Sequence, residues 1–544
     1  MEKEREKQKE EEEERELAAC LNNSTLVGTR LKRYAAEAGD VRYMSPINLT
    51  LKTETKHLRE RVISGTLNNI KRSMEVDLCF VLDCTGSMGG HIDAAKDCII
   101  TVVEHMSRTN PNIKLWVSFC GYRDHCDGDS RLQIFEFTNL YSKFKSYISE
   151  QVSATGGGDA PEDVLGGLDA AVDKIKWTHT TRIILHVGDA PPHGVRFYTG
   201  QDEYPRGDPN GLTAESVLER MRSAQIFYYF GKITNLTDEM LRVFHSIIGE
   251  FPEFDLNIDG GNPEALCTKF FNATCSAITS SVTITSTMAE GMQNRRKDLE
   301  IDISKPAWFL LPVETGVLLH YHSCESLDDI MNPRHFKKSN IITQKYTYKR
   351  APKPFSVGAE RYAYYALDVA HEPNATVIMK EYLELGRQAN SMERYLEAIE
   401  VSTISCFLAK EFNSAAARVG VDKKVEFLQV KLVRRTDTQC HTVEPILPSA
   451  DFKRFNVNSG VITEFRATLE AFAHFTYKFT GGYLVVYDLQ GTELSDQFLL
   501  TDPAIHCTDP LRFGRTNLGK KGIDECFLAN HKCNDVCQKL GFEL

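Results

Sequence analysis

The stretch AFAHFTYKFTGGYLVVYDLQG (residues 471–491), with LLTDPAIHC (499–507) after it, decides the fold of the C-terminal part of this chain. Within it, GYLVVYDLQG is an apolar run that ends in a polar turn, which predicts a buried strand. The turn places Asp488 and Gln490 at the mouth of the strand, and Asp502 follows after a short loop. Carboxylates beside an amide are the hard oxygen ligands that Mg²⁺ and a nucleotide need, so this region is a candidate site for both.

A second chemistry lies near the end of the chain. The segment FGRTNLGKKGIDECFLANHKCNDVCQKL (513–540) contains H-x-C-x3-C, formed by His531, Cys533 and Cys537. Three nitrogen and sulfur ligands within one or two helical turns fit a tetrahedral zinc site that lacks one partner. The residues alone leave three candidates open for the fourth ligand: His474, His506 and Cys507.

Several motifs follow one another in this region: H-F-T-Y, D-L-Q-G, L-T-D-P, T-N-L-G and H-x-C-N-x3-C. Their order resembles that of the atypical alpha-kinase family, which includes the myosin heavy-chain kinases, the elongation factor 2 kinase and the channel-kinases. The resemblance implies an α+β, two-lobed atypical kinase with a structural zinc site over residues 331–544. The HRD and DFG motifs of the usual protein kinases are absent, as expected for an atypical kinase.

The resemblance assigns roles to single residues. A lysine at a strand end, such as Lys380 in NATVIMKEYL, is by itself either a surface residue or a phosphate ligand. In the family this strand carries the lysine that contacts the nucleotide phosphates. Asp502 would orient the substrate hydroxyl, Gln490 would give an oxygen to Mg²⁺, and Asp488 would bind metal or organise its loop.

The family pattern also implies further nucleotide-site residues and the zinc ligands. His474 lies 14 residues before Asp488, which matches the family spacing for the first zinc ligand. The zinc set is then His474, His531, Cys533 and Cys537, with His506 and Cys507 structural. The nucleotide set comprises Gly358 and Ala359 with the lesser candidate Arg361 (phosphate loop), Glu444 (adenine region), Lys453, Asn456 and Asn458 (cleft lining), and Asn517 (nucleotide or its metal).

An alternating β/α series occupies residues 75–250. The apolar run VDLCFVLDCTGSM breaks at Asp83 into a turn of small residues, and apolar residues at helical spacing follow. Strand and helix patterns then alternate as far as residue 250. Such alternation predicts an α/β doubly wound parallel sheet, Rossmann-like, with binding at the carboxyl ends of its strands.

Oxygen-bearing residues gather at those predicted strand ends. The D-x-T-G-S core and the later VGDAPPHG loop resemble the metal-ion-dependent adhesion site of von Willebrand factor A domains. The resemblance implies bound Mg²⁺ or Mn²⁺ and an open position for the carboxylate of a protein partner. The alternatives are a degenerate site or an Asp83 that only caps the next helix. The implied ligands are Asp83, Thr85, Ser87, Thr155 and Asp189.

Two other regions receive simpler interpretations. The loop YRDHCDGD (122–129) offers three aspartates, a histidine and a cysteine, but we favour a solvated loop over a metal site. Residues 256–330, with SVTITSTMA and KPAWFLLPVETGVLLHYH, are predicted to be a β-rich linking region without chemistry. The near match GRTNLGKK (514–521) to a P-loop lacks the final hydroxyl residue, so a P-loop NTPase is rejected.

The length, composition and charge of the whole chain limit the classes of protein that these motifs allow. It has 544 residues, 42% of them hydrophobic and 26% charged, with a net charge of −11, which suggests several domains and argues against nucleic-acid binding. Residues 2–16 are almost all charged and lack an apolar signal region, and no run is long enough for a transmembrane segment. With fifteen scattered cysteines, we expect a reducing, cytoplasmic setting, with recruitment to membranes or the cytoskeleton left to a partner.

Four segments are therefore expected: a charged tail with a helical lead-in (1–71), a von Willebrand A domain (72–255), the linking region (256–330) and the alpha-kinase domain (331–544). The expected function is an ATP-dependent serine/threonine protein kinase that acts on helical or coiled-coil proteins, myosin heavy chain among them. The A domain would bind a partner that bears acidic residues. The rival hypothesis is a catalytically inactive interaction scaffold; an extracellular adhesion protein is disfavoured because no signal sequence is seen.

Overall fold

The computed structural model describes residues 46–257, 262–289, 298–358, 360–370, 373–383, 391–436, 439–448 and 451–543. The chain divides into two compact units. One unit spans residues 69–289, and the other combines residues 290–544 with the chain up to residue 68. Helix α3 (Pro46–Ser73) occupies the end of the predicted helical lead-in, whereas the charged tail lies outside the described residues.

A six-stranded sheet forms the centre of the first unit, in the order β3-β2-β1-β4-β5-β6. All neighbours are parallel except β3, which pairs antiparallel with β2 at the edge. The predicted doubly wound sheet is thus confirmed, but the edge strand β3 was missed. Its strands are β1 (Glu75–Asp83), β2 (Lys114–Tyr122), β3 (Leu132–Thr138), β4 (Thr181–Gly188), β5 (Ile226–Lys232) and β6 (Glu253–Asp255).

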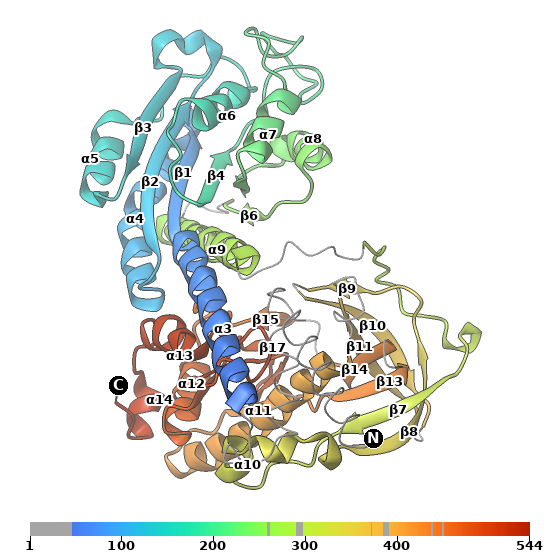
Figure 1. The fold of residues 1–544 in the computed structure, drawn as a ribbon. Helices are drawn as coiled ribbons and strands as arrows, with labels where there is room; N and C mark the ends of the chain where they lie inside the picture. The colour runs from blue at the N-terminus through green and yellow to red at the C-terminus, as the bar shows by residue number, and fades with distance from the viewer. Residues whose placement is uncertain are drawn as a thin grey trace. The chain divides into compact units, whose positions relative to one another are not determined.

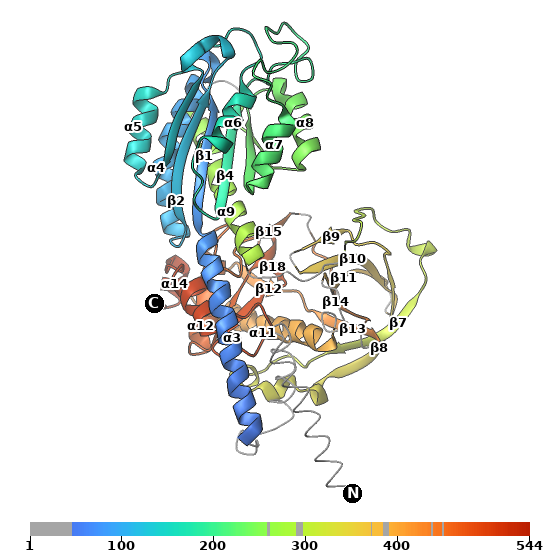
Figure 2. The same ribbon diagram turned by 45° about the horizontal axis from the view of Figure 1, so that its top comes forward.

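Helices cover both faces of this sheet, which is why its strands read as continuous apolar runs. On one face Phe80 of β1 packs near Phe144 and Phe270, whereas its neighbours Cys79 and Val81 face the opposite helices. Figures 1 and 2 show the two layers. The first layer holds α4 (Gly89–Thr109), α5 (Tyr141–Gln151) and α9 (Pro263–Ala289), and the second holds α6 (Val164–Asp173), α7 (Ala214–Ser223) and α8 (Asp238–Ile248).

The predicted β-rich linking region (256–330) is wrong in its first part. SVTITSTMA lies in helix α9, where Phe270, Ala277 and Val282 are buried on one face. Its β-branched residues favour a strand locally, but burial of a helical face against α4 and β4 outweighs that preference. The later part does form a strand, β7 (Glu314–His320), which belongs to a sheet of the other unit.

A seven-stranded antiparallel sheet organises the first part of this other unit, in the order β11-β14-β13-β7-β8-β10-β9. An additional pairing of β10 with β11 closes six of these strands into a ring. Besides β7, the strands of this sheet are β8 (Ile342–Arg350), β9 (Ser356–Val357), β10 (Arg361–Asp368), β11 (Ala375–Tyr382), β13 (Lys431–Thr436) and β14 (Gln439–Pro445).

The rest of this unit packs around helices α11 (Met392–Arg418) and α12 (Ala467–Phe479). The predicted buried strand is β16 (Leu484–Tyr487), whose four residues are all buried. Two small sheets complete the unit: β12 (Lys424–Phe427), β18 (Gln497–Thr501), β17 (Gln490–Glu493) and β15 (Phe452–Arg454), and β16 with β19 (Ala504–Cys507). Short helices are α10 (Leu327–Met331), α13 (Gly519–Gly522) and α14 (Asp535–Lys539).

Within the described parts of the chain, no helix combines the length and apolar character needed to cross a membrane.

The contact between α6 and β2 gives a test of the first unit's packing. A Cβ on Gly167 would lie 2.6 Å from Cδ1 of Tyr122, a buried ring whose hydroxyl lies 2.8 Å from Nε2 of His186. We expect Gly167→Ala to destabilise this unit by about 1–3 kcal/mol, as overpacking does. Gly90→Ala is the matched control, because a Cβ there meets nothing within 4 Å. Thermal melting of both variants measures the difference in stability, and equal melting temperatures would contradict the close contact between Gly167 and Tyr122.

Candidate active site and metal sites

Lys380 on β11 lies between two carboxylates. Its Nζ is 2.5 Å from Oε1 of Glu444 on β14 and donates to Oδ2 of Asp502 at 2.8 Å. Thr501 donates its hydroxyl to Oε2 of Glu444 at 3.0 Å. Because Glu444 belongs to the ring of strands and Asp502 follows β18, one buried ammonium connects two different sheets.

Asp488 and Asp502 both adopt positive φ, 56° and 51°. This backbone region is uncommon for residues other than glycine, and such conformations cluster at functional sites. A guanidinium fixes each side chain: Arg361 donates to Oδ1 of Asp502 at 2.5 Å, and Arg454 makes three contacts of 2.7–3.0 Å with Asp488. Gln490 donates its Nε2 to the backbone oxygen of Asp502 at 3.2 Å, which ties the two turns together.

The cations around Asp502 keep its carboxylate ionised. Burial alone would raise its pKa, but Arg361 and Lys380 outweigh burial and lower the pKa of Asp502 to about 2. For Lys380, burial lowers the pKa, and Asp502 with Glu444 more than reverses this. A carboxylate with so low a pKa is a weak base, so its chemistry suits orientation of a hydroxyl better than removal of its proton.

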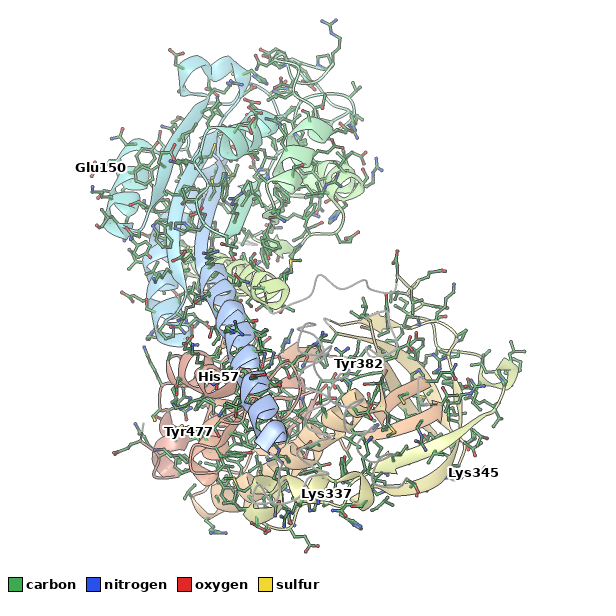
Figure 3. All side chains as sticks on the ribbon, viewed as in Figure 1. His57, Glu150, Lys337, Lys345, Tyr382 and Tyr477 are labelled. Atoms are coloured by element: carbon green, nitrogen blue, oxygen red, sulfur yellow. The ribbon has the colours of Figure 1, made fainter. Side chains whose placement is uncertain are left out.

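Tyr382, labelled in Figure 3, lies two residues after Lys380 at the end of β11. The guanidinium of Arg394 is 3.6 Å from the centre of its ring, and that of Arg361 is 5.7 Å away. Cations over an aromatic face attract the ring quadrupole. Tyr382 therefore helps to hold Arg361, the partner of Asp502.

Other predicted nucleotide residues lie apart from the lysine network. The N–H of Gly358 donates to the backbone oxygen of Arg361 at 2.8 Å in a tight, exposed turn, and Ala359 is outside the described residues. Lys453 on β15 pairs with Asp451 at 3.5 Å and with Glu464 at 3.8 Å. For these residues the nucleotide contact stays a prediction.

Asn517 is fully buried and holds its own loop together. Its Oδ1 accepts from the N–H groups of Cys507 (2.9 Å) and Gly519 (2.8 Å). Its Nδ2 donates to the carbonyls of Asp509 (2.8 Å) and Arg512 (2.7 Å). These bonds use every donor and acceptor of the amide, so they favour a structural role over the predicted nucleotide contact.

Asn456 likewise supports the turn that carries Asp488, which we call the catalytic turn. Its Oδ1 accepts from the N–H of Leu489 at 2.7 Å, and its Nδ2 donates to Glu470 at 3.0 Å. The predicted cleft-lining role is therefore wrong for this buried side chain. Asn458 donates its Nδ2 to the carbonyl of Thr516 at 3.0 Å, so it too braces a loop.

Two contacts of the kinase part were not predicted from the sequence. Arg454 has no motif that marks it, yet it is the partner of Asp488. Arg59 of α3 donates to the carbonyls of Arg515 (2.8 Å) and Asn517 (2.9 Å), and burial lowers the pKa of its guanidinium to about 10. Partners more than 450 residues away in the chain leave no local signal.

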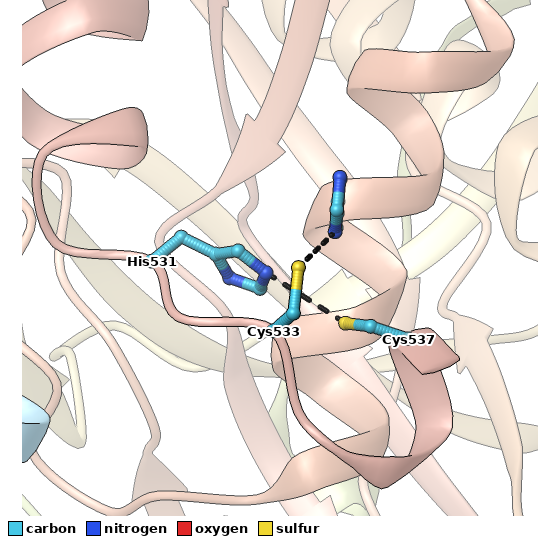
Figure 4. A group of neighbouring side chains, drawn as sticks. His531, Cys533 and Cys537 are labelled. Carbon is cyan, nitrogen blue, oxygen red and sulfur yellow. Dashed lines mark hydrogen bonds between the residues drawn. The ribbon is translucent and has the colours of Figure 1, made fainter. Parts of the chain in front are cut away.

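The four residues of the predicted zinc set meet in one place. Sγ of Cys533 lies 3.7 Å from Nδ1 of His474 on α12, and Sγ of Cys537 lies 3.7 Å from Nε2 of His531. Figure 4 labels three of them, His531, Cys533 and Cys537. All four ligand atoms lie within 4.8 Å of one another. Of the three candidates for the fourth position, His474 lies in this group, whereas Nε2 of His506 lies 3.0 Å from the carbonyl of Asn458.

The first loop of the other unit forms the turn expected of an A-domain metal site. Oδ1 of Asp83 accepts from the N–H (2.9 Å) and the hydroxyl (2.7 Å) of Thr85, while its buried Oδ2 has no hydrogen-bond partner. Burial, despite these bonds, raises the pKa of Asp83 to about 7. The alternative that Asp83 caps the next helix is wrong, because α4 begins without a side-chain cap.

The remaining predicted ligands of this site lie on neighbouring loops. The N–H of Thr155 donates to the carbonyl of Cys84 at 3.0 Å, which brings the second loop beside the first. Thr155 and Ser87 are exposed, and Asp189 is half-buried at the end of β4. Glu162, which the sequence did not single out, is buried with an unpartnered Oε2; burial, Asp83, Asp124 and Asp189 raise its pKa to about 10.

The predicted solvated loop YRDHCDGD is wrong for two of its residues. Asp124 is fully buried, and the His125 side chain is 6% exposed. Both turn toward acidic residues and a histidine from other loops instead of toward solvent.

Comparisons with known proteins agree with this geometry. Residues 356–537 match the alpha-kinase family, and residues 77–198 match the von Willebrand factor A domain. The alpha-protein kinase vwkA of Dictyostelium discoideum is 31% identical over 509 residues, which cover 89% of this chain and 79% of that protein. Myosin heavy chain kinase B of the same organism is 33% identical over 199 residues, 36% of this chain and 26% of that protein.

A solved alpha-kinase domain, that of myosin heavy chain kinase A in complex with ADP, is 28% identical, covers 43% of this chain and 98% of that chain, and has a TM-score of 0.35.

The matched domains and the ionic site define a protein kinase of the alpha type, which transfers the γ-phosphate of ATP, joined to a von Willebrand factor A domain. The chain belongs to the alpha-kinase family.

Removal of Arg454 tests how the catalytic turn is held. We expect Arg454→Met to leave the Asp488 carboxylate, 13% exposed, without its cation. Loss of this partly exposed ion pair should lower the free energy of unfolding by about 1–3 kcal/mol, less than loss of a fully buried pair would. Without the cation that holds Asp488, kinase activity should fall at least about tenfold. Arg435→Met removes a comparable contact, with Glu314 at 2.8 Å on the surface, and should change neither. Equal phosphate-transfer rates in the two variants would contradict this role.

Proposed function

We propose that the chain phosphorylates serine or threonine in helical or coiled-coil protein segments, with myosin heavy chain as a candidate substrate. Two similar proteins named myosin heavy chain kinases support this substrate class. We place the reaction in the cytoplasm and leave recruitment to membranes or the cytoskeleton to a partner of the A domain.

The observation that carries the kinase mechanism is the ion network of Lys380. Its ammonium is already shared by Glu444 and Asp502, so it is fixed in place before any phosphate enters. An ATP phosphate would take up part of this positive charge, and Asp502 would then be free to orient the substrate hydroxyl. Glu444 keeps the ammonium on the side of β14, where the adenine region is proposed.

Asp488 and Gln490 are the proposed oxygen ligands for the Mg²⁺ that accompanies ATP. The donor set fits, because the Nε2 of Gln490 is used by the backbone of Asp502 and its Oε1 remains as an acceptor. Mg²⁺ supplies neutralisation of phosphate charge. Arg454 would hold Asp488 in its unusual backbone conformation throughout.

The A domain is proposed to hold Mg²⁺ or Mn²⁺ through Asp83, Thr85, Ser87, Thr155 and Asp189. The unpartnered, buried Oδ2 of Asp83 fits a cation, because an ionised carboxylate in that position otherwise lacks compensation. The metal would supply an open position for the carboxylate of an acidic protein partner.

Transfer of labelled γ-phosphate from ATP tests the kinase proposal. Wild type should label a myosin-tail-like helical substrate and itself, and Asp502→Ala should lower the rate at least about a hundredfold, because the hydroxyl loses its orienting group. Asp496→Ala, an exposed aspartate in the preceding hairpin, is the control and should remain active. A folded but silent wild type would support the inactive scaffold, and equal labelling by Asp502→Ala would place the role elsewhere.

We also propose that His474, His531, Cys533 and Cys537 bind a structural zinc ion. With Zn–S of about 2.3 Å and Zn–N of about 2.0–2.1 Å, tetrahedral sulfur and nitrogen ligands lie roughly 3.6 Å apart, close to the two observed contacts of 3.7 Å. Oε2 of Glu470 lies 3.6 Å from Nδ1 of His531, the position of a carboxylate that orients a ligating imidazole.

Zinc removal should therefore unfold this region first. We expect chelation, or Cys537→Ser, to remove about one equivalent of zinc and to lower the melting temperature of the kinase part by several degrees. Cys507→Ser is the matched control, since Cys507 is equally buried but lies outside the group. Zinc content and melting are measured together, and a chelator-resistant melting curve would count against the site.

A further inference from the structure

A second group of potential metal ligands lies in the A domain, on loops beside the Asp83 turn. It is built by three loops: the one after β2, the one before α6 and the one after β4. The ligand atoms form two neighbouring groups, and within each group they lie within 4.8 Å of one another. We call them together the loop cluster: Asp124, Asp159 and His193 in the first group, and His125, Asp163 and Asp208 in the second.

His193 is the nitrogen ligand of the first group and is fixed by a carboxylate behind it. Its Nδ1 lies 2.7 Å from Oδ1 of Asp202, and Asp202 in turn accepts from the N–H groups of Gly194 and Tyr204, each at 2.7 Å. A carboxylate on Nδ1 is the usual partner of a metal-ligating imidazole, because it leaves Nε2 for the metal. That Nε2 faces Oδ1 of Asp124 at 2.9 Å.

Asp159 completes the first group with an unsatisfied oxygen. Its Oδ2 accepts from the N–H of Glu203 at 2.6 Å, which fixes the carboxylate, whereas its Oδ1 is buried without a hydrogen-bond partner. Asp124 is fixed as well, since its oxygens accept from the N–H groups of His125 (2.5 Å) and Gly158 (3.2 Å). Ligands held in this way form a site before the metal arrives.

The second group has the spacing of metal ligands, but its contacts are those of an ion-pair network. Nε2 of His125 lies 3.5 Å from Oδ1 of Asp163 and 3.3 Å from Oδ2 of Asp208, yet that Oδ2 has no hydrogen-bond partner. The three side chains are only 6%, 1% and 3% exposed. On the other side of the ring, Nη1 of Arg131 lies 3.3 Å from Nδ1 of His125. A guanidinium only donates, so Nδ1 accepts and Nε2 carries a proton toward the carboxylates, which leaves no lone pair there for a metal.

The charge of the loop cluster also calls for cations. Five aspartates surround it, counting Asp202, and Arg131 is the one guanidinium that pairs with them, through Asp163 at 2.5 Å. The two imidazoles lie 5.4 Å apart, and the ring of Tyr204 packs against both at 5.0–5.1 Å. Buried carboxylates are stable only when paired or bound to metal, and two imidazoles cannot balance this excess.

We propose that the first group of the loop cluster binds one divalent transition-metal ion of the Zn²⁺ type, with His193 as nitrogen ligand and Asp124 and Asp159 as oxygen ligands. Imidazole ligands select zinc-like ions over Mg²⁺, which distinguishes this centre from the all-oxygen set around Asp83. The ion ties the loops after β2 and β4 to the loop before α6, next to the proposed partner-binding face. The proposal does not depend on kinase activity.

Zinc stoichiometry of the purified full chain in excess Mg²⁺ tests the proposal. We expect His193→Ala to lose about one equivalent of zinc relative to wild type. His245→Ala is the matched control, because His245 also lies between two carboxylates, Glu253 at 2.9 Å and Glu250 at 3.4 Å, but on the surface. It should lose none, and neither should Asp83→Asn.

An isosteric variant separates metal binding from simple packing. Asp159→Asn keeps the shape of the side chain, so it should fold, bind the ion at least about tenfold more weakly, and lose part of the zinc-dependent rise in melting temperature. If instead wild type binds only the zinc that Cys537→Ser removes, or if Asp159→Asn raises the melting temperature with and without zinc alike, the group is a metal-free ionic network and the proposal is overturned.

Discussion

The ammonium of Lys380, shared between Glu444 and Asp502, is the interaction on which the kinase part of this chain depends. A buried cation is stable only beside anions, and two buried carboxylates only beside cations. The charges therefore position one another and join the ring of strands to the sheet that ends at Asp502. Arg361, held over Tyr382, balances the remaining charge of Asp502. This explains why a lysine, a glutamate and an aspartate from distant motifs must occur together.

The catalytic turn is connected through buried side chains to the group of His474, His531, Cys533 and Cys537. The N–H of Leu489, next to Asp488, donates to Asn456, which donates to Glu470, whose second oxygen faces His531. A metal ion bound to His531 would orient Glu470 and, through Glu470, the turn that carries Asp488. The structural zinc proposed for the tail thus has a physical route to the active site, and the strained φ of Asp488 has a rigid support on both sides.

The sequence predicts best where the physical cause is local. Continuous apolar runs identified the strands β1, β2, β4 and β16. Ordered motifs identified Lys380, Asp502 and the group of His474, His531, Cys533 and Cys537. Prediction failed where a partner distant in the chain decides the outcome. Helix α9 has strand-like composition but buries a helical face, Asp124 and His125 are buried only because loops from β4 close over them, and Arg454 and Arg59 act on groups that no local pattern reveals.

The dissociation constant of ATP with Mg²⁺, measured by calorimetry for Lys380→Met and Asp502→Asn, tests the central claim most directly. Lys380→Met, combined with Glu444→Gln to restore charge balance, should weaken ATP binding at least about tenfold, because the phosphates lose their cation. Asp502→Asn should bind ATP as well as wild type while phosphate transfer is lost, and Lys338→Met, which removes a surface pair with Glu393 at 2.9 Å, should bind nearly normally. Normal ATP binding without Lys380, or loss of binding without Asp502, would contradict the assignment of the lysine to phosphate and the aspartate to the substrate hydroxyl.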